Sequence, residues 1–429
     1  MKIHQYKTRR RLLGISKKVG DRKLYVWGTG KCANEVLDSL EKHGIQINGI
    51  IVSSVFKTKD EYKGYKLYSI DDVPTDDSYV IVATLSLYTD IFSSLFQHGF
   101  NKDNIYCPFF RYPRKIIYEN RNLIFDTPLL KKQYIKSRIF YYLKRFFYNI
   151  STRGHSPFSI EKKQYYVSIC AIFKNEAPYL KEWIEFHKII GIEHFYLYNN
   201  NSDDNYRDVL KPYIRDNIVT LVQWPMQQGQ MDAYKDCVNK YKNQTNWIGF
   251  IDLDEFVVPK SYNNIKNFLR PIEKKTGALF INWRLFGTSG LMNRDKQGLV
   301  TEDFRVCWPK YDSIGKCFYN TAYKLNENTV FHHWCMTKYK GHDIFPYDVY
   351  GNVCFDNIHT IETDFPLQIN HYFTKSLEEY KEKQHKGDVF FEKSPKDEQY
   401  FFYHEMKCTA IDCSAYKYLI RIKQILENE

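Results

Sequence analysis

The 429-residue sequence lacks several patterns that define well-known classes of protein. Its ten cysteines include no Cys-x-x-Cys pair and no zinc-ligand spacing, which argues against zinc-ribbon and thioredoxin-like sites. No apolar run approaches the roughly 18 residues that a membrane-spanning helix needs. The basic N-terminal run MKIHQYKTRRRLLG has no apolar stretch of the kind found in signal peptides. We therefore expect free cysteines and a protein of the reducing cytoplasm.

What the sequence does contain is positive charge and aromatic side chains. The net charge is +12, and residues 111–163 alone hold thirteen Lys or Arg against three acids, which accounts for +10 of it. Aromatic residues make up 17% of the chain, a surplus that suits sugar rings, membrane interfaces or an ordinary core. The length exceeds that of one hydrophobic core, so we expect two domains and a linker.

Residues 1–112 are predicted to form a small Rossmann-like α/β domain. A buried strand at 23–27 leads into Gly28-Thr-Gly30 and a helix through Glu41, followed by strands near 47–52 and 78–83. Gly28-x-Gly30-x-x-Ala33 is a partial dinucleotide fingerprint. The acid that the fingerprint needs after the second strand is replaced by Val52-Ser53-Ser54. This departure favours a structural or nucleotide-sugar-sensing role over NAD binding.

Residues 113–163 form a basic linker region around a predicted amphipathic helix at 129–150. This helix holds six cations and no acid, and its apolar residues recur with helical spacing. Such a helix can lie in an anionic membrane surface, at the inner face of the membrane. Alternatively, it is a linker helix whose apolar stripe docks on a neighbouring domain. Nucleic-acid binding has no supporting motif here.

From residue 164 the pattern alternates between strands and helices. Strands are expected at 165–173, 194–198, 218–223 and 247–251, with helices at 178–190, 204–213 and 230–241. This alternation predicts an α/β domain over 164–390 with an open, mostly parallel sheet and helices on both faces. A helical extension, 391–429, is expected to pack across the outside.

The acidic run Asp252-Leu253-Asp254-Glu255 follows the last of these strands. Strand periodicity places residues two apart on one face, so Asp252 and Asp254 can address one ligand. Ligands of such sheets bind beyond the carboxyl ends of the strands. Two carboxylates with substrate phosphates are typical ligands of Mg²⁺ or Mn²⁺, which would neutralise a diphosphate leaving group. An Asp-x-Asp pair alone is common, and it also occurs in simple capped loops.

Several further motifs occur around this run in a specific order. They are Phe173-Lys-Asn175-Glu176, Tyr198-Asn-Asn200-Asn-Ser202-Asp-Asp204, Trp224-Pro225, Gln230, Trp283-Arg-Leu-Phe286-Gly287, His332-His333 and Asn370-His371-Tyr372-Phe-Thr-Lys375-Ser376. Over about residues 165–390 the chain resembles glycosyltransferase family 92, relatives of family 2 with a GT-A fold. The resemblance implies a nucleotide-sugar donor site that uses a divalent metal.

The resemblance also implies roles for individual residues. The donor would be bound by Asn175, Glu176, Asn200, Ser202, Asp204, Gln230, Asp252 and Lys375. The metal would be held by Asp252, Asp254 and His371, with His333 as a second choice for the histidine. Ser202 or Asp203 could instead simply cap a helix that begins near residue 204.

Inverting transfer also needs a general base beside the acceptor hydroxyl. Glu302 and Asp303 are the candidates for this catalytic role, with Glu302 favoured and Asp312 behind them. Family relatives usually have a single acid near this position, so the adjacent pair leaves the choice open.

Together these features predict a metal-dependent hexosyltransferase, and the resemblance to family 92 implies inversion at the anomeric carbon. The favoured reaction is the transfer of galactose from a UDP-sugar to a glycan or lipid-linked glycan. One alternative is a pyrophosphorylase-like nucleotide-sugar transferase. Such an enzyme needs a Gly-rich basic loop after the first strand, and Phe173-Lys-Asn-Glu does not supply one. Another is a carbohydrate-binding or scaffold protein on a degenerate fold, against which the intact Asp252 and Asp254 argue.

Overall fold

The computed structural model describes residues 12, 14–52, 60–83, 88–108, 128–154, 157, 160–296, 298–355, 365–386 and 398–427. The chain divides into two compact units, Met1–Phe146 and Phe147–Glu429. Each unit is described by itself below.

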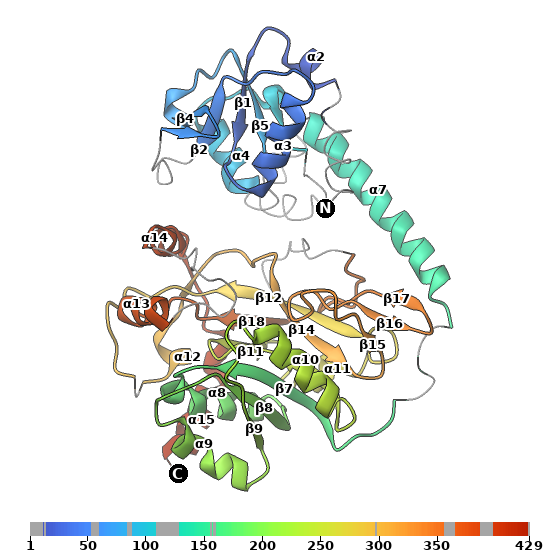
Figure 1. Ribbon diagram of the computed structural model, residues 1–429, viewed down its shortest axis with the longest axis vertical. Helices are drawn as coiled ribbons and strands as arrows, with labels where there is room; N and C mark the ends of the chain where they lie inside the picture. The colour runs from blue at the N-terminus through green and yellow to red at the C-terminus, as the bar shows by residue number, and fades with distance from the viewer. Residues whose placement is uncertain are drawn as a thin grey trace. The chain divides into compact units, whose positions relative to one another are not determined.

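The N-terminal unit is built on a six-stranded sheet with the order β3-β4-β2-β1-β5-β6 (Figure 1). All neighbouring strands in it are parallel except β3 and β4. Apolar cores lie on both faces, one holding α3 residues and the other α4 residues. The strands are β1 (Lys23–Trp27), β2 (Gly49–Val52), β3 (Glu61–Tyr62), β4 (Tyr65–Ser69), β5 (Ser78–Val82) and β6 (Ile105–Tyr106). The helices are α2 (Ile15–Val19), α3 (Lys31–Glu41), η2 (Ile70–Asp72), α4 (Tyr88–Gln97) and η3 (Lys102–Asn104).

The expected Rossmann-like order of strand, glycine turn and helix is present in this unit. Gly28 has φ 113°, a left-handed conformation that favours glycine, and Gly30 precedes the first residue of α3. Of the Val52-Ser53-Ser54 stretch, Val52 ends β2, and the two serines lie outside the described residues.

The basic segment is a single helix, α7 (Pro128–Ser151). Its C-terminal end is anchored by Tyr148, whose hydroxyl accepts a hydrogen bond from the Phe345 amide at 3.1 Å. The Tyr148 ring also packs edge-on against Phe345 and Phe355. Within the described parts of the chain, no helix combines the length and apolarity needed to cross a bilayer.

The second unit is built on an eight-stranded sheet with the order β11-β18-β12-β14-β10-β7-β8-β9. Strands β10, β7, β8 and β9 run parallel, and β14 then pairs antiparallel with both β10 and β12. Next come β12 and β18, which are parallel, and β11, which is antiparallel to β18. The strands are β7 (Tyr165–Phe173), β8 (His194–Asn199), β9 (Val219–Gln223), β10 (Thr245–Phe250), β11 (Glu255–Pro259), β12 (Ala278–Leu285), β14 (Gly315–Asn320) and β18 (Leu367–His371).

Helices cover both faces of this sheet, as the alternating pattern predicted. Along β7, Val167 and Ile169 join a core with α8 and α9 residues, whereas Cys170 and Ile172 join a second core with α10 residues. Strand periodicity accounts for this division. The helices are α8 (Ala177–Ile189), α9 (Tyr206–Arg215), α10 (Gln230–Tyr241), α11 (Lys266–Leu269), α12 (Val300–Asp303), α13 (Leu377–Lys386), α14 (Glu398–Met406), η4 (Ser414–Tyr418) and α15 (Leu419–Glu427).

The C-terminal segment belongs to the core of this unit and is not only an outer covering. Tyr418, Leu419 and Ile422 are buried in the same core as α8. A short strand, β19 (Ala410–Ile411), pairs with β13 (Val306–Cys307). A further small sheet is formed by β15 (Lys324–Leu325), β16 (Thr337–Tyr339) and β17 (His342–Ile344).

Candidate functional site

The predicted site residues gather beyond the carboxyl ends of the parallel strands. Asn175 follows β7, the segment 200–204 follows β8, and Asp252 follows β10. Gln230 opens α10, the helix between β9 and β10. Strands that run parallel end at the same edge of the sheet, where ligands of α/β proteins bind.

The acidic run forms a tight turn between β10 and β11. The Glu255 amide donates to the Asp252 carbonyl at 3.0 Å, and the Asp252 amide donates to the Glu255 carboxylate at 2.8 Å. Glu255 pairs with His371 in the antiparallel ladder of β11 and β18, and the Tyr372 amide donates to the Asp254 carbonyl at 2.8 Å. The ladder therefore brings His371 to the acidic run from 117 residues further along the chain.

Asp254 and His371 meet side chain to side chain. His371 Nε2 lies 3.6 Å from Asp254 Oδ2, and only about a tenth of either side chain is exposed. Burial raises the pKa of the Asp254 carboxyl, but Lys383, His371 and Lys375 outweigh burial and hold the pKa well below its usual value. An ionised carboxylate beside an imidazole nitrogen fits a divalent cation such as Mn²⁺.

Asp252 is already engaged by protein groups on both oxygens. Its Oδ1 accepts from Gln230 Nε2 at 3.0 Å and from the Tyr234 hydroxyl at 2.9 Å. Its Oδ2 accepts from Lys316 Nζ at 2.7 Å. Asp252 therefore fits a metal less well than Asp254, and its role as a ligand stays a prediction.

Two loops near the site are tied together by the predicted donor-binding residues. The Asn175 amide donates to Ser202 Oγ at 2.9 Å, and Asn175 Oδ1 accepts from the Asp203 amide at 2.9 Å. Asp204 Oδ2 accepts from the amide of Ala177, the first residue of α8, at 2.8 Å, and its Oδ1 accepts from the amide of Tyr206, the first residue of α9, at 3.4 Å. Asn200 Nδ2 donates to the carbonyls of residues 224 and 226. These side chains build the loops, and direct contact with a donor stays a prediction for each.

Lys375 lies beside the same loops. Its ammonium is 3.5 Å from the Glu176 carboxylate and 3.5 Å from the centroid of the Tyr179 ring. The Tyr179 hydroxyl donates to Glu379 at 2.6 Å. Lys375 has φ 51°, a strained conformation for a lysine. Strain of this kind clusters at ligand sites, which supports the predicted contact with a donor.

A cleft of about 920 Å³ opens beside Asn175 and Asp203. Its other wall comes from α13 and from the loop that follows β12. That loop is joined to α13 by backbone hydrogen bonds from Leu377 and Glu378 to residues 291 and 292. The lining residues are Lys174, Asn175, Asp203, Met292, Asn293, Leu377, Glu378, Lys381, Glu382 and His385.

The two candidate bases, adjacent in sequence, have different surroundings. Glu302 pairs with Lys423 of α15 at 2.6 Å. Asp303 lies 3.3 Å from the buried guanidinium of Arg294, which follows the cleft-lining Asn293. Burial raises the pKa of Asp303, with Glu302 and Glu379 adding to the effect and Arg294 opposing it. Asp303 thus has the surroundings better suited to a base.

His333, the second choice for a metal ligand, lies near the site with Trp283. Its Nδ1 is 2.7 Å from the Gly315 carbonyl. Burial and the neighbouring Lys316 lower the pKa of His333 to about 4, so the ring is neutral at pH 7. Trp283 packs against His371 and His333, with ring centroids 4.5 and 5.2 Å apart. Phe286, by contrast, is wholly buried and offers no surface to a sugar.

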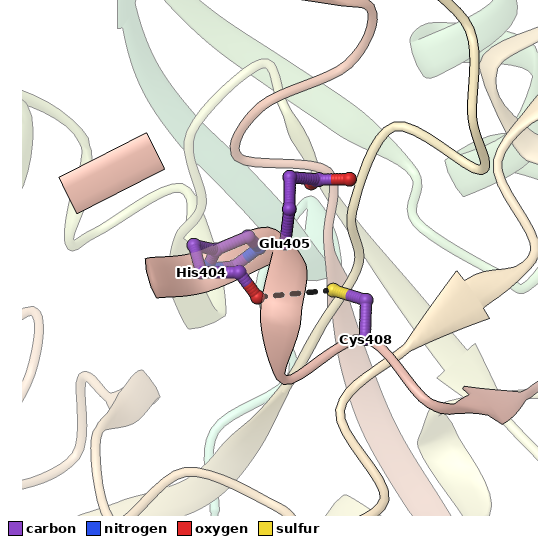
Figure 2. A group of neighbouring side chains, drawn as sticks. All are labelled: His404, Glu405 and Cys408. Atoms are coloured by element: carbon purple, nitrogen blue, oxygen red, sulfur yellow. Dashed lines mark hydrogen bonds between the residues drawn. The ribbon is translucent and has the colours of Figure 1, made fainter. Parts of the chain in front are cut away.

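His404, Glu405 and Cys408 form a second group of potential metal ligands, at the end of α14 (Figure 2). The Cys408 thiol donates to the His404 carbonyl at 3.4 Å, and burial raises the pKa of this thiol. Metals bind the thiolate, so a protonated thiol is a poor ligand. Glu405 accepts from the Thr288 amide at 2.9 Å and from its hydroxyl at 2.7 Å. A Cβ on Gly287 would lie 2.6 Å from both Cys408 Sγ and Glu405 Oε1. The group therefore fastens α14 to the turn after β12.

Sequence reasoning missed two charged residues of the site, Lys316 and Arg294, and it set aside a third, Lys383, which together with Lys386 had been considered as able to screen the diphosphate. Lys316 joins Asp252 to Glu255, Lys383 contacts Asp254, and Arg294 lies between Asp303 and Glu379. A lysine inside the otherwise apolar run Gly315-Lys316-Cys-Phe-Tyr319 was a signal for the first. Lys383 resembled an ordinary solvated lysine in a charged helix.

Comparison with known proteins agrees with this geometry. The profile of glycosyltransferase family 92 matches residues 163–399, more than half of the chain. The chain belongs to glycosyltransferase family 92. The profile described as "C2185-like, N-terminal" matches residues 20–106 in the Rossmann-like unit.

The relatives include plant and animal proteins. A family 92 protein of Oryza sativa subsp. japonica is 31% identical over 143 residues, which is 33% of this chain and 24% of that protein. The beta-1,4-galactosyltransferase galt-1 of Caenorhabditis elegans is 31% identical over 23% of this chain and 27% of its own length. The galactan beta-1,4-galactosyltransferase GALS1 of Arabidopsis thaliana is 29% identical over 36% and 35%. The chain spans about a quarter to a third of the curated relatives it matches.

Among solved structures, the chain is similar to S. aureus TarS 1-349 in complex with UDP. The identity is 14%, the TM-score is 0.27, and the match covers 37% of this chain and 47% of that one.

Proposed function

We propose that this family 92 member transfers a hexose, with galactose favoured, from a UDP-sugar to a glycan or lipid-linked glycan with inversion. The observation that carries the proposal is the pairing of Asp254 with His371 beyond the carboxyl end of β10. A cleft of about 920 Å³ opens at Asn175, in the loop that follows the neighbouring parallel strand β7. The curated relatives named as galactosyltransferases support the choice of sugar.

Asp254 and His371 would hold Mn²⁺ or Mg²⁺, with Asp252 held in place behind them. When bound, the metal would neutralise charge on the diphosphate leaving group. The Lys375 ammonium lies against Glu176, in the loop after β7, and against the ring of Tyr179. From this position Lys375 would place a second positive charge near the diphosphate. Asn175 and Asp203 line the cleft and would hydrogen-bond the nucleoside.

The transfer itself needs a proton acceptor. An acceptor hydroxyl oxygen attacks the anomeric carbon, the bond from that carbon to the diphosphate oxygen breaks, and UDP leaves with the electron pair. The hydroxyl proton passes to a carboxylate. We assign this role to Asp303 in preference to Glu302, because burial raises the pKa of Asp303 and its partner Arg294 follows the cleft-lining Asn293, whereas Glu302 pairs with Lys423 of α15.

The decisive experiment is hydrolysis of a panel of UDP-sugars with Mn²⁺ or with EDTA, for the wild-type protein and for Asp254→Ala. We expect EDTA to abolish turnover and the variant to lose at least about 100-fold in kcat, the scale for removal of charge stabilisation at a leaving group. Lys338→Ala, at an exposed pair with Asp343, is the matched control. Turnover in EDTA, or full activity of Asp254→Ala, would refute the metal mechanism.

We also propose that α7 holds the enzyme on an anionic membrane surface. Ile139, Phe140, Leu143, Phe146 and Phe147 are all more than half exposed, on a helix whose sequence has six cations and no acid over 129–150. The cations and the apolar side chains of this helix together support the membrane proposal.

Vesicle flotation tests this proposal. Phe140→Ser/Phe146→Ser/Phe147→Ser is expected to abolish binding to phosphatidylserine vesicles, and neutral vesicles should bind neither protein. If the triple variant or deletion of 129–150 leaves binding to anionic vesicles unchanged, the helix is a linker.

A further inference from the structure

The ammonium of Lys383 lies against Asp254, one of the two residues proposed to hold the metal. Lys383 lies on α13 and makes an ion pair with Asp254 Oδ2, the oxygen that is also 3.6 Å from His371 Nε2. Its ammonium also lies 4.8 Å from the centroid of the Phe373 ring. A cation bound to Asp254 and His371 would therefore need the place that the Lys383 ammonium now fills.

The burial of the Asp254 carboxylate explains why the Lys383 ammonium lies beside it. The Asp254 side chain is only 12% exposed, and a buried carboxylate is costly unless it is paired. Lys383 provides the charge, yet 42% of its own side chain is exposed. A long, partly exposed side chain on a helix at the cleft can swing away without disturbing the core.

Lys383 is two residues from both Lys381 and His385, so its side chain leaves α13 on a different face from theirs and reaches Asp254. Lys381 and His385 of α13 line the cleft, so α13 forms one wall of the space proposed for the donor. Lys375, at the N-terminal side of α13, already lies against the Glu176 loop. Lys375 and Lys383 both lie close enough to Asp254 to lower the pKa of its carboxyl against the effect of burial, so a diphosphate bound beside Lys375 would also attract the Lys383 ammonium once Asp254 is neutralised.

We propose that Lys383 is an exchangeable counter-ion, paired with Asp254 in the empty site and with the donor diphosphate in the loaded site. This inference rests on the proposed metal and donor site. It predicts opposite effects of Lys383 on its two ligands. The lysine competes with a divalent cation for Asp254, and it assists the binding of a nucleoside diphosphate.

The test measures both affinities in Lys383→Met, which keeps the length of the side chain and removes its charge. Binding of Mn²⁺ alone is followed by the EPR signal of the free ion, and binding of UDP at saturating Mn²⁺ by calorimetry. We expect the Kd for Mn²⁺ to fall at least about 3-fold and the Kd for UDP to rise about 10-fold, the scale of one charge-assisted contact. Lys338→Met, at an exposed ion pair with Asp343 away from the cleft, should change neither Kd more than about 2-fold.

The outcomes separate the two proposals. If both affinities fall together in Lys383→Met, or neither changes, the exchange is refuted while metal-dependent transfer stands. If the wild-type protein binds no Mn²⁺ and turns over donor in EDTA, the metal site and the exchange are both refuted. A thermal melt checks that Lys383→Met is folded. If the exchange occurs, Mn²⁺ should raise the Tm of Lys383→Met more than that of the wild type.

Discussion

Lys316 Nζ lies 2.7 Å from Asp252 Oδ2 and 3.5 Å from Glu255 Oε2, and no part of the Lys316 side chain is exposed. Burial raises the pKa of Glu255 well above its usual value, and it opposes ionisation of Asp252 as well. For Asp252, Lys316 outweighs burial and lowers the pKa. One buried cation thus keeps the first carboxylate of the acidic run ionised.

Removal of that cation should destabilise the fold strongly. Lys316→Met would leave a buried carboxylate unpaired, so we expect a loss of about 3–5 kcal/mol in the free energy of unfolding. Urea denaturation measures the loss. Lys338→Met, at an exposed ion pair, should change stability by less than about 0.5 kcal/mol. Equal losses in the two variants would contradict the role of Lys316.

Two buried histidines should make stability depend on pH. Burial lowers the pKa of His187 to about 3 and that of His194 to about 4, whereas an unfolded histidine has a pKa near 6.5. Both rings stay neutral in the folded protein, so the unfolded state binds more protons as pH falls below about 6.5. The stability is therefore fully present above that pH and is lost progressively below it.

The expected loss between pH 7 and pH 5 is about 2 kcal/mol per histidine, from 1.36 kcal/mol per pKa unit. His187→Gln can keep the bonds to the Trp183 carbonyl and Val257 amide while it removes the titration. The variant should lose less stability over this pH range than the wild type, as measured by urea midpoints at both pH values. An unchanged pH dependence would show that His187 does not set it.

Replacing each candidate base by the corresponding amide shows which of the two accepts the proton. Asp303→Asn should lower kcat for transfer by about 100-fold or more, the usual scale for loss of a general base. Glu302→Gln should stay within a few-fold of the wild type, because its carboxylate faces Lys423. A large loss in Glu302→Gln with an active Asp303→Asn would reverse the assignment.

Lys375 should act on donor affinity and on the stability of the fold. Lys375→Met removes the ammonium and is expected to raise the Kd for UDP about 10-fold, equivalent to about 1.4 kcal/mol. The Glu176 carboxylate, 19% exposed, also loses its cation, so we expect the free energy of unfolding to fall by about 1–3 kcal/mol. Calorimetry and a thermal melt together check this. An unchanged Kd for UDP would remove Lys375 from the donor site.

Local sequence patterns predicted the fold well. The apolar run of residues 165–173 and the stripe of α8 follow from side-chain periodicity, which needs no knowledge of distant residues. The place of Asp252 and Asp254 beyond β10 followed for the same reason. The boundaries differed by only one or two residues, as for the strand predicted at 247–251 and found at Thr245–Phe250.

Charges that arrive from distant segments were not predictable in this way. Lys316 reaches Asp252 only because β14 pairs with β10, with Gly249 opposite Phe318. Lys383 reaches Asp254 from a helix 129 residues away in sequence. Such contacts depend on strand register and helix placement, which composition and periodicity do not contain.

The insertion of β18 between β11 and β12 has a consequence for how the chain is made. Residues 367–371 leave the ribosome long after the two strands that they join. Until then β11 and β12 have open edges, which can pair with other chains. The same late strand carries His371. A nascent chain therefore brings Asp254 and His371, the pair proposed to hold the metal, together in the step that joins β11 to β12 through β18. If the pair binds Mn²⁺ as proposed, Mn²⁺ binding would report that this step has occurred.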